Sequence, residues 1–295
     1  MTSESARLRD PPGERDVESL LSFGVINLDK PPGPSAHQVS AWVKRLTDLD
    51  RAAHAGTLDP KVTGVLPVLL GDATRLVPAM LEGTKEYVAV LELHARAPED
   101  LESTVGEFEG EIYQKPPRKS AVARRLRTRT VHALEVLEVT DRQALLRMTV
   151  ESGTYVRKLC HDIGLALGTR AHMGDLRRTA TTPFDDTALQ TLHDLADGMA
   201  RYEESGRADW LREVVKPAER ALSHLPAVVI APSAAREVAH GAPVYAPGVI
   251  EGPAAEPEGL VVCTTPDGAA VCLGTLVGDP EAESGTVVDL EAVLV

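Results

Sequence analysis

Hydrophobic and polar residues alternate along the first two thirds of the chain with two different periods. Residues 23–30 form a short apolar run that stops at Pro31-Pro32-Gly33-Pro34, which predicts a strand followed by a rigid turn. Ser35 and Gln38 then have the spacing of a helix capping box, and apolar residues recur at helical spacing as far as Leu46. The pattern therefore predicts a strand, a turn and a helix with one buried face.

The same two periods continue through the middle of the chain. Continuous or alternating apolar residues predict strands at 65–70, 85–93, 131–139 and 144–150. Helical spacing predicts helices at 73–81, where Pro78 should shorten the helix, and from Val156 to a glycine stop at Gly168. Residues 183–197 have a helical, acidic pattern. Strands and helices are thus mixed in this part of the chain.

The pattern changes near Pro226. Short β-branched runs at 228–230, 260–263 and 270–276 are separated by Gly and Pro turns, which is typical of a small all-β barrel. At roughly 150 residues per domain, 295 residues favour two domains. We predict a polar, disordered tail at 1–16, a large domain at 17–225 and a small β domain at 226–295.

The distribution of apolar residues and the cysteine spacing indicate where the protein is located and whether it holds disulfides or a metal. Residues 1–16 lack the apolar core of a signal peptide, and no run of about 18 apolar residues occurs later, so we expect a cytoplasmic protein without membrane contact. Cys160, Cys263 and Cys272 have neither the CxxC spacing nor the spacing of metal ligands. Three reduced thiols and no metal are therefore expected.

The charge balance is unusual for a protein that binds nucleic acid. The formal net charge is -13, with 31 basic and 44 acidic residues, and only 8 of the basic residues are lysines. Adaptation to concentrated salt and an ordinary acidic cytosolic protein both explain this excess. One segment, 115–129, carries seven basic residues and no acidic one, and arginine binds phosphate in a bidentate manner. We predict RNA contacts from this basic segment, at Lys115, Arg118, Lys119, Arg124, Arg125 and Arg127.

A single carboxylate stands in a loop of special shape. The segment 54–66 reads HAGTLDPKVTGVL, with Gly56 and Gly64 on either side of Asp59 and Pro60 directly after it. The residue before a proline is kept out of the helical region, so Asp59 should be extended or in a turn. A catalytic carboxylate and a simple Asp-Pro turn are the two interpretations.

The segment 54–66 resembles the second motif of the TruB/dyskerin family of RNA pseudouridine synthases, in which the aspartate of a Gly-Thr-Leu-Asp-Pro run is the nucleophile. Residues 30–35, KPPGPS, resemble that family's first motif, although Ser35-Ala36 stands where many members have Thr-Ser. Residues 152–157, SGTYVR, resemble the motif whose arginine pairs with the catalytic aspartate. The resemblance covers residues 22–180.

The resemblance implies a role for each matching residue. Asp59 is the expected nucleophile and Arg157 its partner. An arginine within about 4–6 Å lowers a carboxylate pKa by about 1–3 units and would keep Asp59 ionised. Tyr87 is expected to stack on the target base and to accept a proton, and Leu176 to pack beside the uracil. His54 is placed to fill the vacated stack. Ordinary core or loop roles are the alternatives for the last three.

The position of Arg157 gives an independent hint. It follows Gly153 and falls in the first turn of the helix predicted from Val156, where a cation is unfavourable for the helix dipole. A role other than helix stability is therefore indicated. In the first motif, Lys30 is expected to contact RNA phosphate or the catalytic loop, and a solvated lysine at a strand end is the alternative.

The resemblance also implies a fold. An α+β catalytic domain is expected, with a mixed, largely antiparallel sheet and flanking helices. Residues 240–248, HGAPVYAPG, resemble the start of a PUA domain, a small all-β RNA-binding barrel. No cofactor and no metal are needed, because the isomerisation exchanges a C1'–N1 bond for a C1'–C5 bond.

Two substrates fit the implied activity. The chain would convert uridine to pseudouridine either at tRNA uridine-55 or at rRNA sites chosen by a guide RNA, as the catalytic subunit of an H/ACA ribonucleoprotein with small core proteins. A non-catalytic RNA-binding or assembly protein with the same fold is the alternative. A generic hydrolase is disfavoured, because Asp59 has no second carboxylate or histidine at a recognisable spacing.

Overall fold

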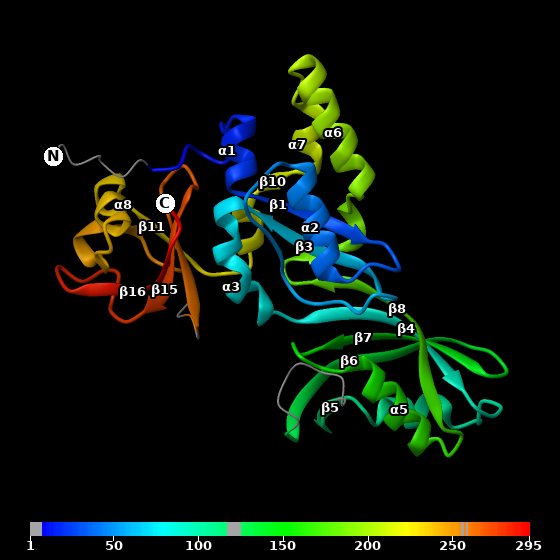
Figure 1. Ribbon diagram of the computed structural model, residues 1–295. Coiled ribbons are helices and arrows are strands. Elements are labelled where there is room, and N and C mark those ends of the chain that lie inside the picture. Colours follow the sequence, from blue (N-terminus) through cyan, green and yellow to red (C-terminus); the bar gives the residue numbers. More distant parts are fainter. Residues whose placement is uncertain (1–7, 117–124, 255–256, 258) are drawn as a thin grey trace.

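The computed structural model describes residues 8–116, 125–254, 257 and 259–295. It contains a ten-stranded sheet and a six-stranded sheet that lie side by side (Figure 1). No helix in these ranges is both long enough and apolar enough to cross a membrane.

The ten-stranded sheet runs in the order β10-β1-β3-β8-β4-β7-β6-β5, with β2 paired to β3 and β9 paired to β8. All its pairs are antiparallel except β3 with β8. The predicted mixed, largely antiparallel sheet is therefore confirmed. Its strands are β1 (Gly24–Lys30), β2 (Ala52–His54), β3 (Thr63–Leu70), β4 (Lys85–Leu93), β5 (Gly110–Gln114), β6 (Arg127–Val139), β7 (Gln143–Val150), β8 (Ala171–Thr181), β9 (Phe184–Asp185) and β10 (Lys216–Pro217).

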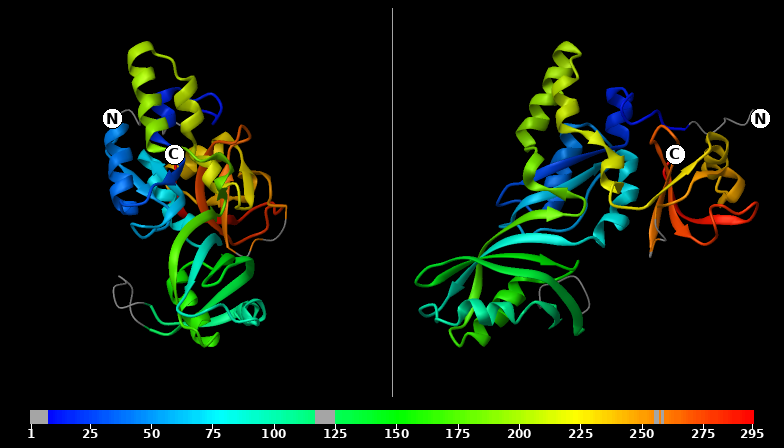
Figure 2. Two further views of the ribbon diagram at one scale, coloured as in Figure 1. Left: turned by 90° about the vertical axis from the view of Figure 1, so that its right-hand side faces the viewer. Right: turned by 180° about the vertical axis from the view of Figure 1, so that it is seen from behind.

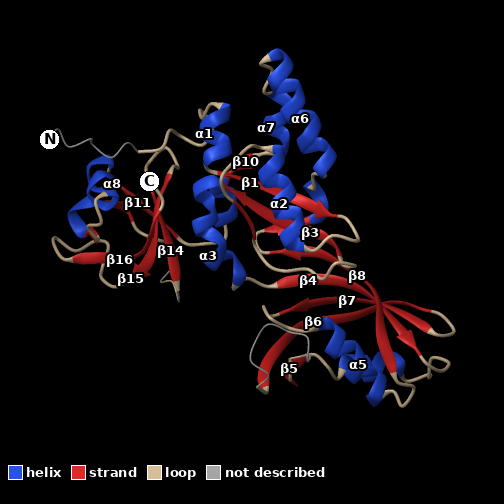
Figure 3. Cartoon of the chain, viewed as in Figure 1, coloured by secondary structure: helices blue, strands red, loops and turns tan. Residues whose placement is uncertain are grey.

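Helices flank both ends of this sheet (Figure 3). Around the β1–β3 end lie α1 (Val17–Ser22), α2 (Ala36–Leu46), α6 (Leu192–Ser205) and α7 (Asp209–Val214). Around the β5–β7 end lie α4 (Leu101–Gly106) and α5 (Val156–Ala166). The short η1 (Gly71–Leu76) and α3 (Val77–Leu81) lie toward the six-stranded sheet. Each end of the sheet thus has its own hydrophobic core.

Local sequence signals explain two of these helices. The predicted capping box of α2 is present, with Gln38 N donating to Ser35 Oγ at 3.2 Å and Ser35 N donating to Gln38 Oε1 at 2.8 Å. In α5, a side chain on Gly164 would overlap the backbone of Ala171, so glycine lets the helix lie directly against the start of β8. This close packing fixes α5 relative to the sheet.

The six-stranded sheet has the order β12-β16-β15-β14-β11-β13 and is barrel-like. Its strands are β11 (Ala227–Ile230), β12 (Val244–Tyr245), β13 (Val249–Glu251), β14 (Leu260–Thr264), β15 (Ala270–Leu276) and β16 (Thr286–Val293). The expectation of an all-β unit missed one helix, α8 (Pro232–Ala239). This helix has eight residues and buries Ala235 and Val238, so its apolar pattern spans only about two turns and is easily overlooked between strands.

The expectation of a disordered tail at 1–16 is wrong for its described part, residues 8–16. Arg9 Nε donates to the Leu294 carbonyl at 2.8 Å, and Arg15 binds both carboxylate oxygens of Glu219 at 2.9 and 2.6 Å. Glu219 also accepts from Ala270 N at 3.1 Å. Polar residues are ordered here because arginines reach a carboxylate in the short helix Ala218–Leu222 and a carbonyl just after β16. Seen from behind, this segment runs beside the six-stranded sheet before it enters α1 (Figure 2).

A third core joins the two sheets. Val25 and Leu69 from the large sheet share this core with Val262 and Leu273 from the small one. The predicted domain boundary at residues 225 and 226 remains a prediction. Residues from both sides of it share this core, so the core does not separate the two predicted domains. The two sheets meet through apolar side chains as well as through the arginines of residues 8–16.

Candidate active site

Asp59 lies on the loop between β2 and β3, which we call the aspartate loop (residues 55–62). The loop is closed by backbone hydrogen bonds from Ala55 N to Pro67 O, 2.9 Å, and from Val62 N to Asp59 O, 3.0 Å. The turn of the first motif also touches it, because Gly33 N donates to Pro60 O at 2.8 Å. Asp59 is therefore presented on a shaped loop, as predicted.

Arg157 and Asp59 form an ion pair through Nη2 and Oδ2. Arg157 stands in the first turn of α5, so the contact joins residues 98 positions apart. The two side chains are 53 and 50 % exposed, so the pair stays open to solvent and to a polymer substrate. The structure thus brings the two predicted groups together, while their catalytic roles remain predictions.

The glycines around Asp59 have separate structural reasons. Gly56 has φ +101° and Gly64 has φ +99°, a region that side chains rarely adopt. A side chain on Gly64 would also overlap the carbonyl of Arg178 in the neighbouring β8. The loop can leave β2 and enter β3 in this shape only because both positions are glycine.

Lys30 corrects a prediction. Its side chain is 0 % exposed, and its ammonium donates to the carbonyls of Pro31, Pro60 and Val62 at 2.9, 3.0 and 2.8 Å. Since an ammonium has three donors, none is left for a phosphate. Burial also lowers the pKa of Lys30. The expected RNA contact is therefore replaced by an internal role, which is to hold the aspartate loop against the first motif.

Tyr87 and Leu176 lie on the adjacent strands β4 and β8. Tyr87 is the cross-strand partner of Arg178, and Ala89 is the partner of Leu176. Both side chains are half-buried, and both pack against the cores at the two ends of the sheet. They therefore lie where these cores meet, with part of each side chain open to solvent.

One residue of this region was missed by the sequence analysis. Arg178 is 1 % exposed, and it donates from Nε to Val65 O at 2.7 Å and from Nη2 to Gly56 O at 3.3 Å. Burial lowers its pKa, and the interaction with the neighbouring Tyr87 partly offsets this effect. A second arginine next to Arg177 in a polar stretch gives no sequence signal for burial.

His54 lies on β2, opposite Val68 in β3. It is half-buried, and its Nδ1 is buried without a hydrogen-bond partner among the described residues. Its pKa is lowered by burial, and further by the charges of His37 and Arg178. The imidazole is therefore neutral at physiological pH. Its expected role in the vacated stack stays a prediction.

The basic segment connects two paired strands, β5 and β6. Gln114, the last residue of β5, and Arg127, the first residue of β6, are cross-strand partners. Lys115 and Arg125 are exposed, and Arg127 is half-buried. The expected contacts Arg118, Lys119 and Arg124 lie outside the described residues. The described residues among those predicted to contact RNA thus lie at the end of β5 and the start of β6.

The end of β5 is tied to the helix that carries Arg157. Gln114, 2 % exposed, accepts from Tyr155 N at 2.8 Å through Oε1 and donates through Nε2 to Tyr155 O at 3.2 Å. Tyr155 is the residue at which α5 begins. The end of β5, where the basic segment begins, is therefore hydrogen-bonded to the start of the helix that carries Arg157.

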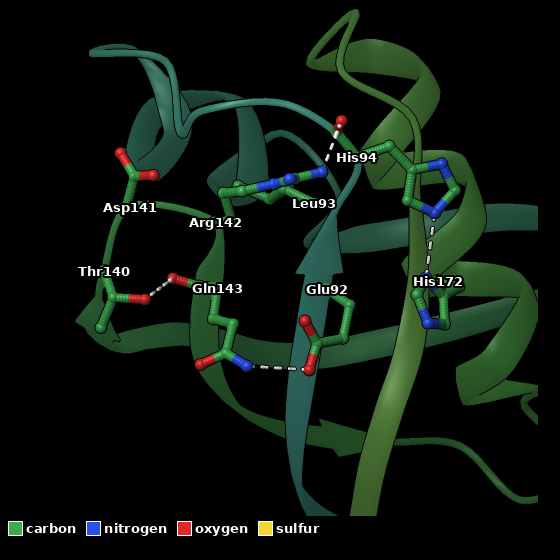
Figure 4. Close-up of a pocket in the computed structure, with 8 residues that line it drawn as sticks. All are labelled: Glu92, Leu93, His94, Thr140, Asp141, Arg142, Gln143 and His172. Atoms are coloured by element: carbon green, nitrogen blue, oxygen red, sulfur yellow. Dashed lines mark hydrogen bonds between the residues drawn. The ribbon is translucent and has the colours of Figure 1, made fainter.

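Two cavities lie elsewhere. The larger of the two, about 500 Å³, is lined by the end of β4, the turn between β6 and β7 and the start of β8, with Glu92, Arg142, His94 and His172 among the lining residues (Figure 4). His94 Nε2 lies 3.0 Å from His172 Nδ1, and no predicted site residue takes part. A smaller one, about 300 Å³, lies beside the first motif. Nowhere in the described ranges do three or more His, Cys, Asp or Glu side chains gather as metal ligands.

Three family models match the chain in succession. Residues 9–40 match the DKCLD domain, and residues 44–156 match the N-terminal domain of the TruB family pseudouridylate synthases. Residues 157–223 match the C-terminal domain of tRNA pseudouridylate synthase B. Asp59 and Tyr87 fall in the second of these matches, and Arg157 opens the third.

Relatives with known names match over almost the whole length. A probable tRNA pseudouridine synthase B of Haloarcula marismortui is 65% identical, covering 100% of this chain and 96% of the relative. That of Halobacterium salinarum is 66% identical, with 98% and 99% covered, and that of Pyrococcus abyssi is 49% identical, with 96% and 87% covered.

Solved structures agree with the fold of the entire chain. A Cbf5-Nop10-Gar1 complex contains a chain that is 48% identical, with a TM-score of 0.92 over 98% of this chain and 90% of that one. An H/ACA ribonucleoprotein bound to a substrate RNA with 2'-deoxyuridine contains one that is 46% identical, with a TM-score of 0.91 over 100% and 92%.

Proposed function

The chain belongs to the TruB family of pseudouridylate synthases and is an RNA pseudouridine synthase, and from this premise we propose that Asp59, Arg157 and Tyr87 form its active site. The ion pair between Asp59 and Arg157 carries the proposal. It is half-exposed, it joins two distant segments, and its aspartate stands on a loop that buried side chains hold from behind. An ordinary surface ion pair needs none of this support.

In the proposed reaction, the C1'–N1 bond of uridine breaks, the base turns, and a C1'–C5 bond forms. C5 loses its hydrogen as a proton, and N1 gains a proton, so the product has the same atoms as the substrate. Asp59 supplies the carboxylate that acts as nucleophile or proton acceptor. Arg157 favours its ionised form by direct charge pairing. No atom is gained, so the residues need only hold the pieces together and move a proton.

The detached base needs a pocket. Tyr87 offers an aromatic face and Leu176 a branched apolar side chain, and both are half-buried on neighbouring strands. A base reaches such a pocket only when its nucleotide is flipped out of the stack, at a cost of a few kcal/mol. We assign His54, neutral because of its burial, to the space that the base leaves.

The RNA grip is assigned to two parts of the chain. The basic segment supplies Lys115, Arg125 and Arg127 among its described residues, and arginine suits phosphate geometry. The six-stranded sheet, residues 226–295, is proposed as a PUA domain beside a catalytic domain at 17–225. Both parts recognise the RNA backbone and shape more than base sequence.

We further propose that the chain is the catalytic subunit of an H/ACA-type particle, with a guide RNA and small proteins like Nop10 and Gar1 as partners. The proposal is supported by TM-scores of 0.92 and 0.91 to chains solved in such complexes. Activity on tRNA uridine-55 is part of the same proposal, because the relatives are named tRNA pseudouridine synthase B. A cytoplasmic location also belongs to it.

Tritium release from uracil C5 tests the chemistry and the partner requirement together. The purified chain is assayed on a tRNA T-arm transcript, and the chain assembled with guide RNA and core proteins is assayed on a guide-paired target. Salt is varied up to molar concentration, where the Debye length falls to about 3 Å and an acidic protein no longer repels RNA at long range.

Wild type should release tritium, and Asp59→Asn should release none while it binds RNA with almost unchanged affinity. Release from the T-arm alone would identify an autonomous tRNA enzyme, and release only in the assembled particle would identify a guide-dependent one. Equal loss of catalysis and RNA affinity in Asp59→Asn would contradict the assignment of Asp59. Bound RNA without any release in either assay would instead indicate an assembly protein.

A further inference from the structure

A buried guanidinium lies directly behind the aspartate loop. Arg178 is 1 % exposed, and in the part of the chain that the structure describes no carboxylate pairs with it. Placing an unpaired charge in the interior is costly, so a fold without a use for it would replace it with an apolar side chain. The neighbouring Arg177 has an ordinary arrangement, paired with Asp29 at 3.0 Å near the surface.

Arg178 holds both ends of the aspartate loop. Its Nη2 donates to the carbonyl of Gly56, where the loop begins, and its Nε to that of Val65, just after it ends. The missing side chain of Gly56 makes room for it, since a Cβ there would stand 3.3 Å from Nη1. The guanidinium of Arg178 therefore sets the distance between the carbonyls of Gly56 and Val65, which lie on either side of Asp59 in the chain.

The same guanidinium also touches the proposed base pocket. Arg178 and Tyr87 are direct partners in the antiparallel pair β8–β4, so their side chains are on the same face of the sheet. Directly opposite residues of an antiparallel pair have Cβ atoms about 4.5–5.5 Å apart, so the two side chains are immediate neighbours. Arg178 is thus a link between the loop that presents the carboxylate and the ring that is proposed to stack on the base.

We propose that Arg178 is a positioning residue for the isomerisation, which sets where Asp59 stands relative to Tyr87 without itself touching RNA. The inference rests on the proposed function. A planar fork with donors in fixed directions can hold two carbonyls at a set spacing, which the flexible ammonium of a lysine does less well. Misplacement of a catalytic group by about 1 Å can cost about 100-fold in rate. Arg178 should therefore influence the rate of the reaction rather than RNA binding.

The test compares Arg178→Met and Arg178→Lys with a matched control, Arg147→Met. Arg147 lies in β7 of the same sheet and is half exposed in a surface ion pair with Glu135. Single-turnover tritium release at saturating RNA gives the rate, filter binding gives the RNA affinity, and thermal unfolding gives the folded fraction. The proteins are tested in whichever form, free chain or assembled particle, makes the wild type active.

Arg178→Met is expected to lose about 100-fold in rate with RNA affinity unchanged, and Arg178→Lys to recover part of that loss. Arg147→Met should keep the wild-type rate. A rate for Arg178→Met within about threefold of the control, or a loss that is all in RNA affinity, would overturn the inference. An inactive wild type would instead count against the proposed function, so the two failures are distinguishable.

A double-mutant cycle decides the matter if Arg178→Met does not fold. Arg178→Lys, Tyr87→Phe and the double variant are compared by rate. If Arg178 acts through Tyr87, the two losses will overlap, and the double variant will be little slower than the slower single one. Fully additive losses would show that the two residues act independently, and the positioning role would be rejected.

Discussion

Gln114 and Tyr155 exchange two hydrogen bonds, at 2.8 and 3.2 Å, across 41 positions of the chain. The glutamine ends β5, where the basic segment begins, and the tyrosine is where α5 begins, one turn from the Asp59–Arg157 pair. The basic segment, which we propose binds RNA, is therefore joined through one side chain to the start of the helix that carries Arg157.

Gln114→Met should uncouple the end of β5 from α5. It keeps the side-chain volume but removes the Gln114 oxygen that accepts from Tyr155 N, whereas Tyr155 O keeps the N–H groups of Lys158 and Leu159 as donors. The loss of this buried hydrogen bond should lower the free energy of unfolding by about 1–3 kcal/mol. We expect a slower single-turnover reaction as well, because the start of α5 is less constrained. Gln143→Met is the control, since that exposed amide bonds only Glu92 at 2.9 Å. Equal stability of the two variants would contradict the proposed coupling.

Lys30→Met should destabilise the protein without changing the salt dependence of RNA binding. The carbonyls of Pro31, Pro60 and Val62 each lose the Lys30 ammonium as a donor, and the last two belong to the aspartate loop. A loss of about 2–4 kcal/mol in the free energy of unfolding is expected, measured by urea titration. If the slope of log RNA affinity against log salt were smaller for Lys30→Met than for wild type, Lys30 would be shown to contact phosphate, contrary to this structure.

Neutralising Arg125 and Arg127 together, each to Gln, should weaken RNA binding for all sequences alike. Each lost phosphate contact lowers the slope of log K against log salt by about 0.7–0.9, so a change of about 1.5 is expected. Arg96→Gln with Arg207→Gln provides a charge-matched control, because both arginines are in exposed pairs with aspartates. The basic-segment proposal fails if both double variants have the same slope.

Lys85 should make stability depend on pH in the alkaline range. Burial, and then the charge of Arg178, lowers its pKa from an ordinary value of 10.5 to about 8 in the folded protein. Between these values the unfolded chain binds one proton more than the folded one, so the free energy of unfolding rises with pH. Wild type should therefore gain stability relative to Lys85→Met from about pH 8 to about pH 10.

Urea titrations of both proteins at several pH values measure this difference. Groups that titrate alike in the two proteins cancel, so the comparison isolates Lys85. A constant difference in stability across the range would mean that Lys85 has an ordinary pKa. A difference that shrinks with pH would mean that Lys85 is stabilised as a cation in the fold.

Local periodicity was sufficient for most of the elements that build the site. The strands β1, β3, β4 and β7 and the helices α2 and α5 follow the predicted patterns closely. The contact between Asp59 and Arg157 was predicted only from the family resemblance, because local sequence patterns do not connect positions 98 residues apart. The helix predicted at 183–197 instead runs from Leu192 to Ser205, since the capping box at Thr191 and Asp194 decides where it starts.

What the sequence did not reveal concerns buried charges. β8 was not predicted as a strand, because it carries charged residues within a central position of the sheet. The roles of Lys30 and Arg178 depend on carbonyl groups that come from loops elsewhere in the chain. Sequence patterns record which side chains are apolar, and they contain no information about where backbone acceptors will point.

The segment of residues 8–16 has a consequence for the order in which the molecule is completed. Arg9 bonds the carbonyl of Leu294, 285 positions later, and Arg15 bonds Glu219. Residues 8–16 can therefore form all of these contacts only after Leu294 has been synthesised. During translation the large sheet can fold as a unit, but the junction between the two sheets closes only when the final strand arrives.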